Sequence, residues 1–518
     1  MPKKYDFLTK TKIQSGQQCT KKLWFDVHQP IPKEDRIEKS VFARGIRFGD
    51  VIKKHYTKVY GKSLNLDGDW YGPIKKTEEA INSDDINVIY EGTFEYLNTQ
   101  VKTDVLIRKK NGWALLEAKS STKLKPEHIQ DISIQSFIVR KCMKQLGHNL
   151  ISIKLIHINK DFTLKKEGDY QDLINDENDL TSEITETEIT NYIENLIPLT
   201  IKNSPCPEKD MGPHCRKPYD CDYQDRCKSL LPKSNVTPFT ILPYIGKDKK
   251  LNEYMKNEGT MDLQKVPLRF FKDRKDYAPG YHKIIQDAHK NNEPWFSPNL
   301  KNIFKKFSFP FYFIDFETIM QGVPIIKGTQ PYYAVPFQWS LHKWDSVDKE
   351  INDGESFLKF KDHDIERQFI ESLLKAVDEN GTIFAHNAQG TEIKTLERLK
   401  EKDNCKDLAD KIDKLIERIE DSLIIARNNF YSPLMNGDWG IKSIIKAIPD
   451  SNISYEEAGN IDGDDAAQLA WFICTNPKTS DDDKKKEKKL LIDYCAKDTL
   501  AVYYLIKYLI NKSEEAGN

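Results

Sequence analysis

The sequence predicts an α/β protein built from two units with a helical connector between them. From Phe307 onward, apolar runs of strand length alternate with helix-like stretches, which is the pattern of a layered α/β domain. Farther upstream, two strand-like runs flank an Asn-Gly pair, the usual signal of a tight hairpin. A Pro-Lys-Ser-Asn break at residues 232–235 separates the two halves. We therefore expect a first unit over residues 1–232, a helical connector over 233–305 and a second unit over 306–512.

Composition limits the classes of protein to which the chain can belong. Its 518 residues are enough for two or three domains, each with its own core. The formal net charge is -1 and charged residues make up 31%, so any basic nucleic-acid surface must be local, around 140–144 or 301–306. We find neither a run of about 20 apolar residues nor a signal peptide. We therefore expect a cytoplasmic protein with no membrane partner, whose nine cysteines are reduced or bound to metal.

Two strands and a tight turn are predicted in the first unit. Residues 101–107 have a strand-like pattern, and residues 113–119 form the expected return strand. Asn111 and Gly112 lie between the two runs, and this pair tolerates the positive φ that a hairpin turn requires. A helix is expected to begin at Asp131.

These elements carry a possible metal site. Glu117 and Lys119 share one face of the return strand, and Asp104 on the partner strand could meet them. Such a set suits metal-assisted phosphodiester cleavage, because the carboxylates hold the metal while the lysine orients water and offsets phosphate charge. Glu91 is a candidate further carboxylate, and Gln135 on the helix is placed to touch substrate or metal-bound water. Alone, Glu-x-Lys is a weak signal, since exposed strand faces carry such pairs frequently.

The cysteines are unevenly distributed. Four of them lie at positions 206, 215, 221 and 227, and Cys19 stands alone near the start, whereas Cys142, Cys405, Cys474 and Cys495 are scattered and are expected to be structural or incidental. Four thiolates suit an iron–sulfur cluster, and they suit Zn²⁺ equally well. The cysteines alone leave that choice open.

The second unit begins with an acidic strand. The apolar run 311–318 contains Asp315 and Glu317, and residues two apart on a strand share a face. Two carboxylates so close together repel each other unless a cation lies between them, and a divalent metal commonly fills that role. Far downstream, Tyr494 and Asp498 are four residues apart in a predicted helix and share one face. Together these two elements form the outline of a two-metal exonuclease.

The first unit resembles the RecB-like nucleases of the PD-(D/E)XK superfamily, and most closely their iron–sulfur branch, typified by the CRISPR-associated nuclease of the Cas-four kind. The features that carry the resemblance are Ser15 to Trp24, Asp104, Glu117-Ala118-Lys119, Gln135 and the late cysteine trio. The resemblance implies a 4Fe–4S cluster held by Cys19, Cys215, Cys221 and Cys227, with Cys206 as the spare. The branch often supplies a metal-binding histidine after its first helix, but residues 45–50 contain none.

The second unit resembles a DnaQ-like (RNase H-like) exonuclease of the DEDDy kind. The matching segments are 312–318, 336–342, 440–443 and 494–499. Taken together, the chain looks like a bacterial family of unassigned function that fuses these two nuclease units. The resemblance implies a 3′–5′ exonuclease acting on DNA with Mg²⁺ or Mn²⁺, in which Asp315, Glu317, Glu392 and Asp498 bind metal and Tyr494 orients water.

The third carboxylate is the least regular part of this resemblance. DEDD enzymes place an acid soon after an asparagine that follows a strand, and here Glu392 follows Asn387 with a spacing one residue long. Asp421 is the competing or additional ligand, and His386 is interpreted as a packing or hydrogen-bonding residue rather than a base. Two alternatives remain open: an RNA exonuclease, and a nucleic-acid-binding scaffold in which one nuclease site is inactive.

Overall fold

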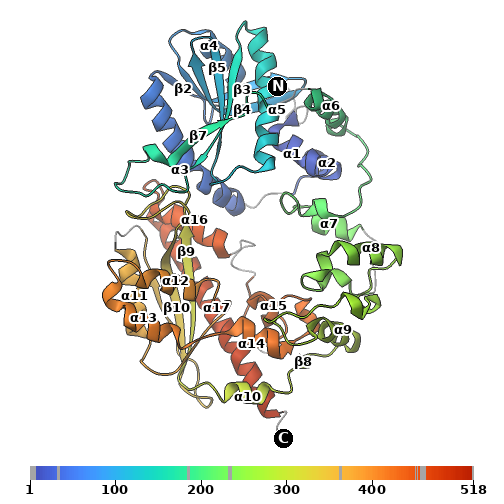
Figure 1. Cartoon of the computed structure of the whole chain (residues 1–518), viewed down its shortest axis with the longest axis vertical. Helices are drawn as coiled ribbons and strands as arrows, with labels where there is room; N and C mark the ends of the chain where they lie inside the picture. Colours follow the sequence, from blue (N-terminus) through green and yellow to red (C-terminus); the bar gives the residue numbers. More distant parts are fainter. Residues whose placement is uncertain are drawn as a thin grey trace. The chain divides into compact units, whose positions relative to one another are not determined.

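The structure is a computed structural model, and it confirms a mixed α/β protein. It describes residues 8–31, 35–69, 71–183, 187–230, 236–360, 364–449, 451, 453–455 and 463–515. The chain divides into two compact units, of which unit 1 comprises Met1–Lys233 and Gln321–Tyr333, and unit 2 comprises Ser234–Met320 and Ala334–Asn518 (Figure 1). The break predicted at 232–235 lies outside the described residues.

Unit 1 is built on one sheet with helices packed against it. Its strands are β1 Leu8–Thr9, β2 Ser63–Asn65, β3 Val88–Tyr96, β4 Thr99–Lys109, β5 Gly112–Lys119, β6 Leu150–Ile158 and β7 Ile174–Asp179. Its helices are α1 Lys10–Gln18, α2 Thr20–His28, α3 Asp35–Tyr60, α4 Pro73–Asn82, α5 Pro126–Gln145, α6 Thr187–Leu196 and α7 Gln224–Ser229.

The unit 1 sheet has the order β2-β3-β4-β5-β6-β7, and β1 pairs in parallel with the start of β4. The predicted hairpin is confirmed, because Lys109 pairs with Gly112 and the antiparallel register continues to Val105 opposite Leu116. Alternate residues of β4 face two different cores, so that Leu106 packs on one side of the sheet and Ile107 on the other. Because both faces of β4 are buried, a shift of register would move apolar side chains to the wrong face, so the pairing of β4 is fixed.

A short segment between the two parts of unit 2 belongs to unit 1. It runs from Gln321 to Tyr333, between β9 and β10 of unit 2. Val323 is buried in a unit 1 core, and the Leu164 N–H donates to the Thr329 carbonyl at 3.0 Å. The chain therefore leaves unit 2 after Met320 and returns to it at Ala334.

Unit 2 contains a five-stranded sheet and a small two-stranded one. Its strands are β8 Trp295–Phe296, β9 Phe311–Met320, β10 Ala334–Trp344, β11 Glu355–Leu358, β12 Thr382–Ala385, β13 Ile419–Asp421 and β14 Phe430–Tyr431. Its helices are α8 Lys249–Asn257, α9 Tyr281–Asn291, α10 Leu300–Phe304, α11 Ile365–Ala376, α12 Glu392–Lys400, α13 Ala409–Ile416, α14 Ser422–Asn429, α15 Ile441–Ile445, α16 Gly463–Thr475 and α17 Asp481–Glu515. The run of charged residues at 481–489 begins α17.

The larger sheet of unit 2 has the order β11-β10-β9-β12-β13, with β9 at its centre. Strand β9 is antiparallel to β10 and parallel to β12, which is in turn parallel to β13. Tyr312, Ile314 and Phe316 pack on the core formed with α11, α12 and α13. Phe311 and Phe313 face the opposite core, which α17 covers. The period of two along β9 thus assigns each face to a different helical layer.

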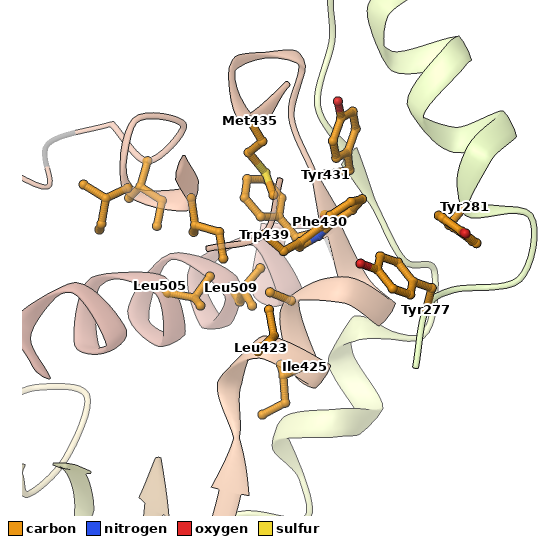
Figure 2. Close-up of a cluster of buried hydrophobic side chains, with 14 of the residues drawn as sticks. Tyr277, Tyr281, Leu423, Ile425, Phe430, Tyr431, Met435, Trp439, Leu505 and Leu509 are labelled. Carbon is orange, nitrogen blue, oxygen red and sulfur yellow. The ribbon is translucent and has the colours of Figure 1, made fainter. Parts of the chain in front are cut away.

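The segment predicted as a connector contributes to the core of unit 2. Tyr277 and Tyr281 lie in the same buried cluster as Tyr431 and Trp439, which come about 150 residues later in the sequence (Figure 2). The rings of Tyr277 and Trp439 meet edge to face, with centroids 5.2 Å apart. Aromatic pairs of this kind add stabilisation beyond the area that they bury. Among the described residues, no helix has the length and apolar character needed to cross a membrane.

Candidate functional site

Carboxylates from four elements gather at one edge of the unit 2 sheet. Asp315 and Glu317 continue the face of β9 on which Phe311 and Phe313 are buried. Because β9, β12 and β13 are parallel, their carboxyl ends lie at the same edge, where Glu392 begins α12 and Asp421 ends β13.

Helix α17 supplies the fourth element. It covers this face of the sheet and carries Tyr494 and Asp498 on one side. Every residue predicted for the second site therefore lies at this edge or on the helix above it. The charge of Asp315 raises the pKa of both Glu392 and Asp498, because the three side chains lie near one another.

Several neighbours fix the carboxylates. The Cys495 thiol donates to Asp315 Oδ2 at 3.1 Å, and the Tyr455 hydroxyl donates to Asp498 Oδ1 at 2.7 Å. The Phe316 N–H donates to Glu392 Oε1 at 3.3 Å. The other oxygen of Glu392 is buried and has no hydrogen-bond partner within the described part of the chain. A buried polar atom without a partner is costly, and it commonly marks a position that a ligand completes.

Burial and like charge determine the electrostatics of this carboxylate cluster. Burial raises the pKa of Asp315 to about 6. Burial, reinforced by the charge of Asp315, raises the pKa of Asp498 to about 7, although the positive charge of Lys442 opposes this shift. The pKa of Glu392 is raised well above its usual range by the same two causes. A divalent cation would relieve both the desolvation and the repulsion, so these oxygen donors fit Mg²⁺ or Mn²⁺.

Asp421 has a structural role that Glu392 lacks. Its Oδ1 accepts hydrogen bonds from the N–H groups of Leu423 at 2.9 Å and Asn387 at 3.0 Å, so it caps α14 and holds the turn after β12. Its charge also raises the pKa of Glu392, which places it beside the cluster. Both candidates for the third ligand are therefore brought to the site, and Glu392 has the unpartnered oxygen.

His386 has hydrogen-bond partners at both ring nitrogens. Nε2 lies 3.0 Å from the Trp439 carbonyl, to which it must donate, and Nδ1 lies 3.0 Å from the Ser422 hydroxyl, from which it accepts when the ring is neutral. Burial lowers the pKa of His386 to about 4. The interpretation of His386 as a hydrogen-bonding residue is confirmed.

The raised carboxyl pKa values predict that the stability of the metal-free protein depends on pH in an unusual direction. Because Asp315 and Asp498 bind protons more tightly in the folded state than in the unfolded state, the free energy of unfolding of metal-free protein should fall as pH rises from about 4 to about 7. We expect a loss on the order of 3 kcal/mol from Asp315 alone, measured by urea unfolding in EDTA. Asp315→Asn should flatten this dependence relative to wild type, and an unchanged pH profile in that variant would contradict the assignment.

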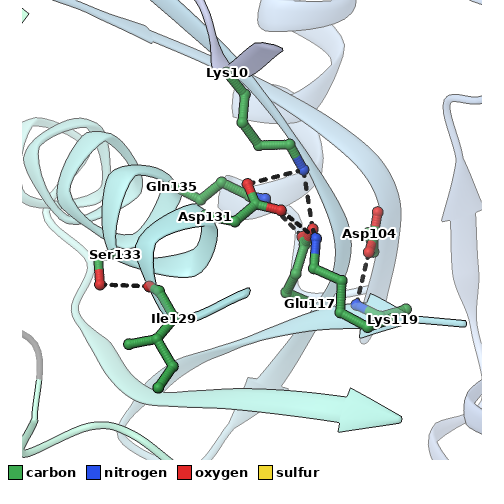
Figure 3. Close-up of polar contacts among 9 residues, drawn as sticks. Lys10, Asp104, Glu117, Lys119, Ile129, Asp131, Ser133 and Gln135 are labelled. Carbon is green, nitrogen blue, oxygen red and sulfur yellow. Dashed lines mark hydrogen bonds and ion pairs between the residues drawn. The ribbon is translucent and has the colours of Figure 1, made fainter. Parts of the chain in front are cut away.

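Unit 1 contains a second cluster of charged groups, shown in Figure 3. Lys119 Nζ lies 2.7 Å from Glu117 Oε1 and also pairs with Asp131 on α5. Gln135 Nε2 donates to Glu117 Oε2 at 2.6 Å, and the Ala118 N–H donates to Asp104 Oδ2 at 2.7 Å. The structure therefore brings together Asp104, Glu117, Lys119 and Gln135, as the sequence predicts.

Glu91 lies on β3 beside the same cluster. The register pairs Tyr90 with Val105 and Gly92 with Thr103, which places Glu91 opposite Asp104. Burial raises the pKa of Glu91, and the charges of Asp67 and Glu117 add to this shift while Lys53 and Lys102 oppose it. Glu91 therefore lies near the cluster, and charged groups outside the cluster also act on it.

Two residues of this cluster were not predicted. Asp131 is on the same face of α5 as Gln135, four residues later, a spacing that could have indicated it. Lys10, at the start of α1, reaches Glu117 Oε1 at 2.9 Å and Asp131 Oδ1 at 3.3 Å. It is 107 residues from Glu117 in the sequence, and no local pattern joins the two.

The carboxyl groups of this cluster differ in the direction of their pKa shifts. Burial alone would raise the pKa of Glu117, but the charges of Lys10 and Lys119 outweigh it and hold that pKa below its usual range. Burial and the charge of Glu117 raise the pKa of Asp104 to about 8. Burial likewise raises the pKa of Asp131. Glu117 is therefore the anion that the two lysines neutralise.

A pocket near the start of α2 is lined by four cysteines. Its lining includes Cys19, Cys215, Cys221 and Cys227, but not Cys206, and it encloses about 330 Å³ with its open mouth included. Gln18 Nε2 ties the two chain segments together by donating to the carbonyl oxygens of His214 at 2.9 Å and Tyr219 at 2.6 Å.

The thiols that line this pocket are suitable metal ligands. Four thiols on one pocket fit a thiolate-bound cluster or Zn²⁺. Burial raises the pKa of the Cys221 and Cys227 thiols, whereas Lys22 and Lys21 respectively oppose this shift. Within the described residues, no three His, Cys, Asp or Glu side chains stand in an arrangement that would coordinate a metal ion directly.

Comparison with known families finds a match to part of unit 2. A family described as "Domain of unknown function (DUF2779)" matches residues 312–440. This range contains Asp315, Glu317, Glu392 and Asp421, but it ends before Asp498 and includes none of the unit 1 cluster. The comparison with curated proteins finds no match.

Proposed function

We propose that unit 2 is a metal-dependent exonuclease that removes nucleotides from the 3′ end of DNA. The observation that carries this proposal is the gathering of Asp315, Glu392 and Asp498 at one sheet edge, where burial and mutual repulsion raise their pKa values. Structural carboxylates are normally paired with cations or hydrogen-bond donors, whereas metal-binding carboxylates repel one another until the metal arrives. The RNase H-like fold is proposed with it, supported by a mixed sheet that has the acidic strand β9 at its centre.

Each residue has a distinct part in this proposal. Asp315, Glu317, Glu392 and Asp498 would hold two divalent cations, with Asp421 as the further or competing ligand. Bound metal would lower the pKa of a water molecule and stabilise the leaving oxygen. Tyr494 lies one helical turn before Asp498 and would orient that water, while the Cys495 thiol holds the Asp315 carboxylate in place.

Unit 1 is proposed as a second nuclease unit of the PD-(D/E)XK kind. Asp104, Glu117 and Lys119 would form its cleavage site, with Gln135 as a supporting residue that donates to Glu117. The four-cysteine pocket would hold a 4Fe–4S cluster, or Zn²⁺ as the alternative. The support for this proposal is that distant segments of the chain meet at the pocket. Cys19 lines it together with the late cysteines Cys215, Cys221 and Cys227.

The activity can be tested directly on the full chain. Purified protein would be incubated with Mn²⁺ or Mg²⁺ and with single- and double-stranded DNA and RNA, each labelled at the 5′ or the 3′ end. We expect 5′-labelled DNA to shorten progressively and 3′-labelled DNA to release mononucleotides at once, with no activity in EDTA. Cleavage of RNA alone would replace DNA with RNA as the substrate. No hydrolysis of any substrate would contradict the proposal.

The third ligand can be identified in the same assay. We expect Glu392→Gln to reduce the rate more than Asp421→Asn, because Glu392 has an unpartnered buried oxygen whereas Asp421 already caps α14. Loss of a metal ligand should cost on the order of a hundredfold or more in rate. Circular dichroism melting of both variants would separate loss of the cap from loss of the metal. Full activity in Glu392→Gln with an inactive, folded Asp421→Asn would assign the third ligand to Asp421.

A further inference from the structure

The geometry points to a specific role for Lys10: its ammonium group occupies the cation position of the unit 1 cluster. A divalent metal must displace this ammonium group in order to bind there. This inference rests on the proposed metal site of unit 1 and does not depend on the exonuclease site of unit 2. It adds a residue from the start of the chain to a site otherwise formed by β4, β5 and α5.

The position of Lys10 is that of a bound cation. Its Nζ lies 2.9 Å from Glu117 Oε1 and 3.3 Å from Asp131 Oδ1, so it bridges a strand carboxylate and a helix carboxylate (Figure 3). The charge of Asp104 also acts on it. A divalent cation in the same place would contact the same carboxylates, at the shorter metal–oxygen distances of about 2.0–2.6 Å.

Three of the four acceptor positions of the Glu117 carboxylate are occupied while Lys10 is in place. Its Oε1 accepts from both Lys10 and Lys119, and its Oε2 accepts from Gln135. Both Glu117 and Asp131 are almost fully buried, with 1% and 2% of their surface exposed. A metal that joined this cluster beside two ammonium groups would meet repulsion in a region of low polarity, where it is poorly screened.

If Lys10 left the cluster, its carboxylates would be able to bind a divalent metal. Without Lys10, the carboxylates of Asp104, Glu117 and Asp131 would face a single lysine, Lys119. The buried Oε1 of Gln135, which has no hydrogen-bond partner within the described part of the chain, would then be available to a metal-bound water. Lys10 is somewhat more exposed than Lys119, with 26% of its side chain accessible compared with 18%. Lys10 also lies in the first turn of α1, next to the short β1.

Metal binding by the full chain tests this inference without an activity assay. The unit 2 site would first be silenced with Asp315→Ala and Asp498→Ala, and Mn²⁺ binding would be followed by electron paramagnetic resonance and calorimetry. In this background we expect Lys10→Met to raise the Mn²⁺ affinity at least roughly tenfold, because one competing charge is removed. Lys123→Met, at an exposed lysine shortly after β5, is the matched control and should leave the affinity unchanged. Asp104→Asn should abolish the gain.

A second measurement uses unaltered Lys10 and does not depend on how the methionine variant folds. Pulse acetylation and mass spectrometry would follow the Lys10 amine, which its buried partners should protect in metal-free protein. We expect saturating Mn²⁺ to increase acetylation of Lys10 severalfold, and Asp104→Asn to prevent the increase.

The possible results separate this inference from the proposed function. Unchanged or weaker Mn²⁺ binding in folded Lys10→Met, or Lys10 acetylation that Mn²⁺ does not alter, would overturn the role of Lys10. If no Asp104-dependent Mn²⁺ binding is found with or without Lys10, the unit 1 metal site itself fails as well. Neither result bears on unit 2, whose activity is judged by the nucleic-acid assay.

Discussion

Asp315→Ala is expected to abolish metal-dependent exonuclease activity while leaving the protein folded. Asp315 is the residue whose charge raises the pKa of both Glu392 and Asp498, so it lies at the centre of the cluster. Loss of a ligand shared by the metals should lower the rate roughly a thousandfold or more, because metal contributes several kcal/mol to transition-state stabilisation. The measurement is single-turnover hydrolysis of end-labelled DNA at saturating Mn²⁺.

The same substitution should not destabilise metal-free protein at neutral pH. Removing one of several like charges relieves repulsion, which offsets the loss of the hydrogen bond from the Cys495 thiol. Asp482→Ala, in the exposed first turn of α17, is the control and should keep full activity. Full activity in Asp315→Ala, combined with loss of activity in Asp104→Ala, would move the exonuclease to unit 1.

Cys19→Ser is expected to remove iron from the protein and to destabilise unit 1. If the four pocket cysteines bind one cluster, anaerobically purified wild type should be brown and should contain about four iron atoms per chain. The cluster would join segments about 200 residues apart, a loop whose closure is entropically costly without a crosslink. By loop entropy alone, a crosslink of this length contributes roughly 5 kcal/mol. Iron analysis, visible absorption and thermal unfolding of unit 1 would measure the loss.

Cys206→Ser is the matched control for the cysteine experiment. Cys206 belongs to the same segment but does not line the pocket, so both the colour and the stability should be kept. Colourless wild type with one zinc per chain would replace the iron–sulfur cluster with Zn²⁺ and retain the crosslink. Loss of iron in Cys206→Ser with iron kept in Cys19→Ser would reject the long-range crosslink.

The parts of the fold that the sequence predicted are those with strong local patterns. The period of two in β9 placed Asp315 and Glu317 on one face, and the Asn-Gly pair located the hairpin between β4 and β5. The late helix was identified from Tyr494 and Asp498 at a spacing of four. In each case a short stretch of chain determines the conformation, so tertiary contacts were not needed.

The contacts that were missed join distant parts of the chain. Lys10 meets Glu117 because β1 pairs with β4 and aims α1 at the sheet, and neither residue carries a local sign of the other. Cys495 was expected to be structural or incidental, and the hydrogen bond from its thiol to Asp315, which lies 180 residues earlier, was not predicted. Tyr455 reaches Asp498 from a loop with no periodic pattern. Such pairs are set by packing between elements, which composition and spacing do not encode one by one.

The segment from Gln321 to Tyr333 has a consequence for any attempt to produce one half of this protein alone. A shortened chain that starts at Ser234 would retain this segment but lose its hosts, among them the Leu164 N–H and the core around Val323. The β9–β10 hairpin would then close through a loose loop with an apolar side chain in water. Because β9 carries Asp315 and Glu317, low yield or weak metal binding in such a fragment would reflect its broken loop and would say nothing against the proposed metal ligands. Replacing 321–333 with a short polar turn should make the isolated half easier to purify.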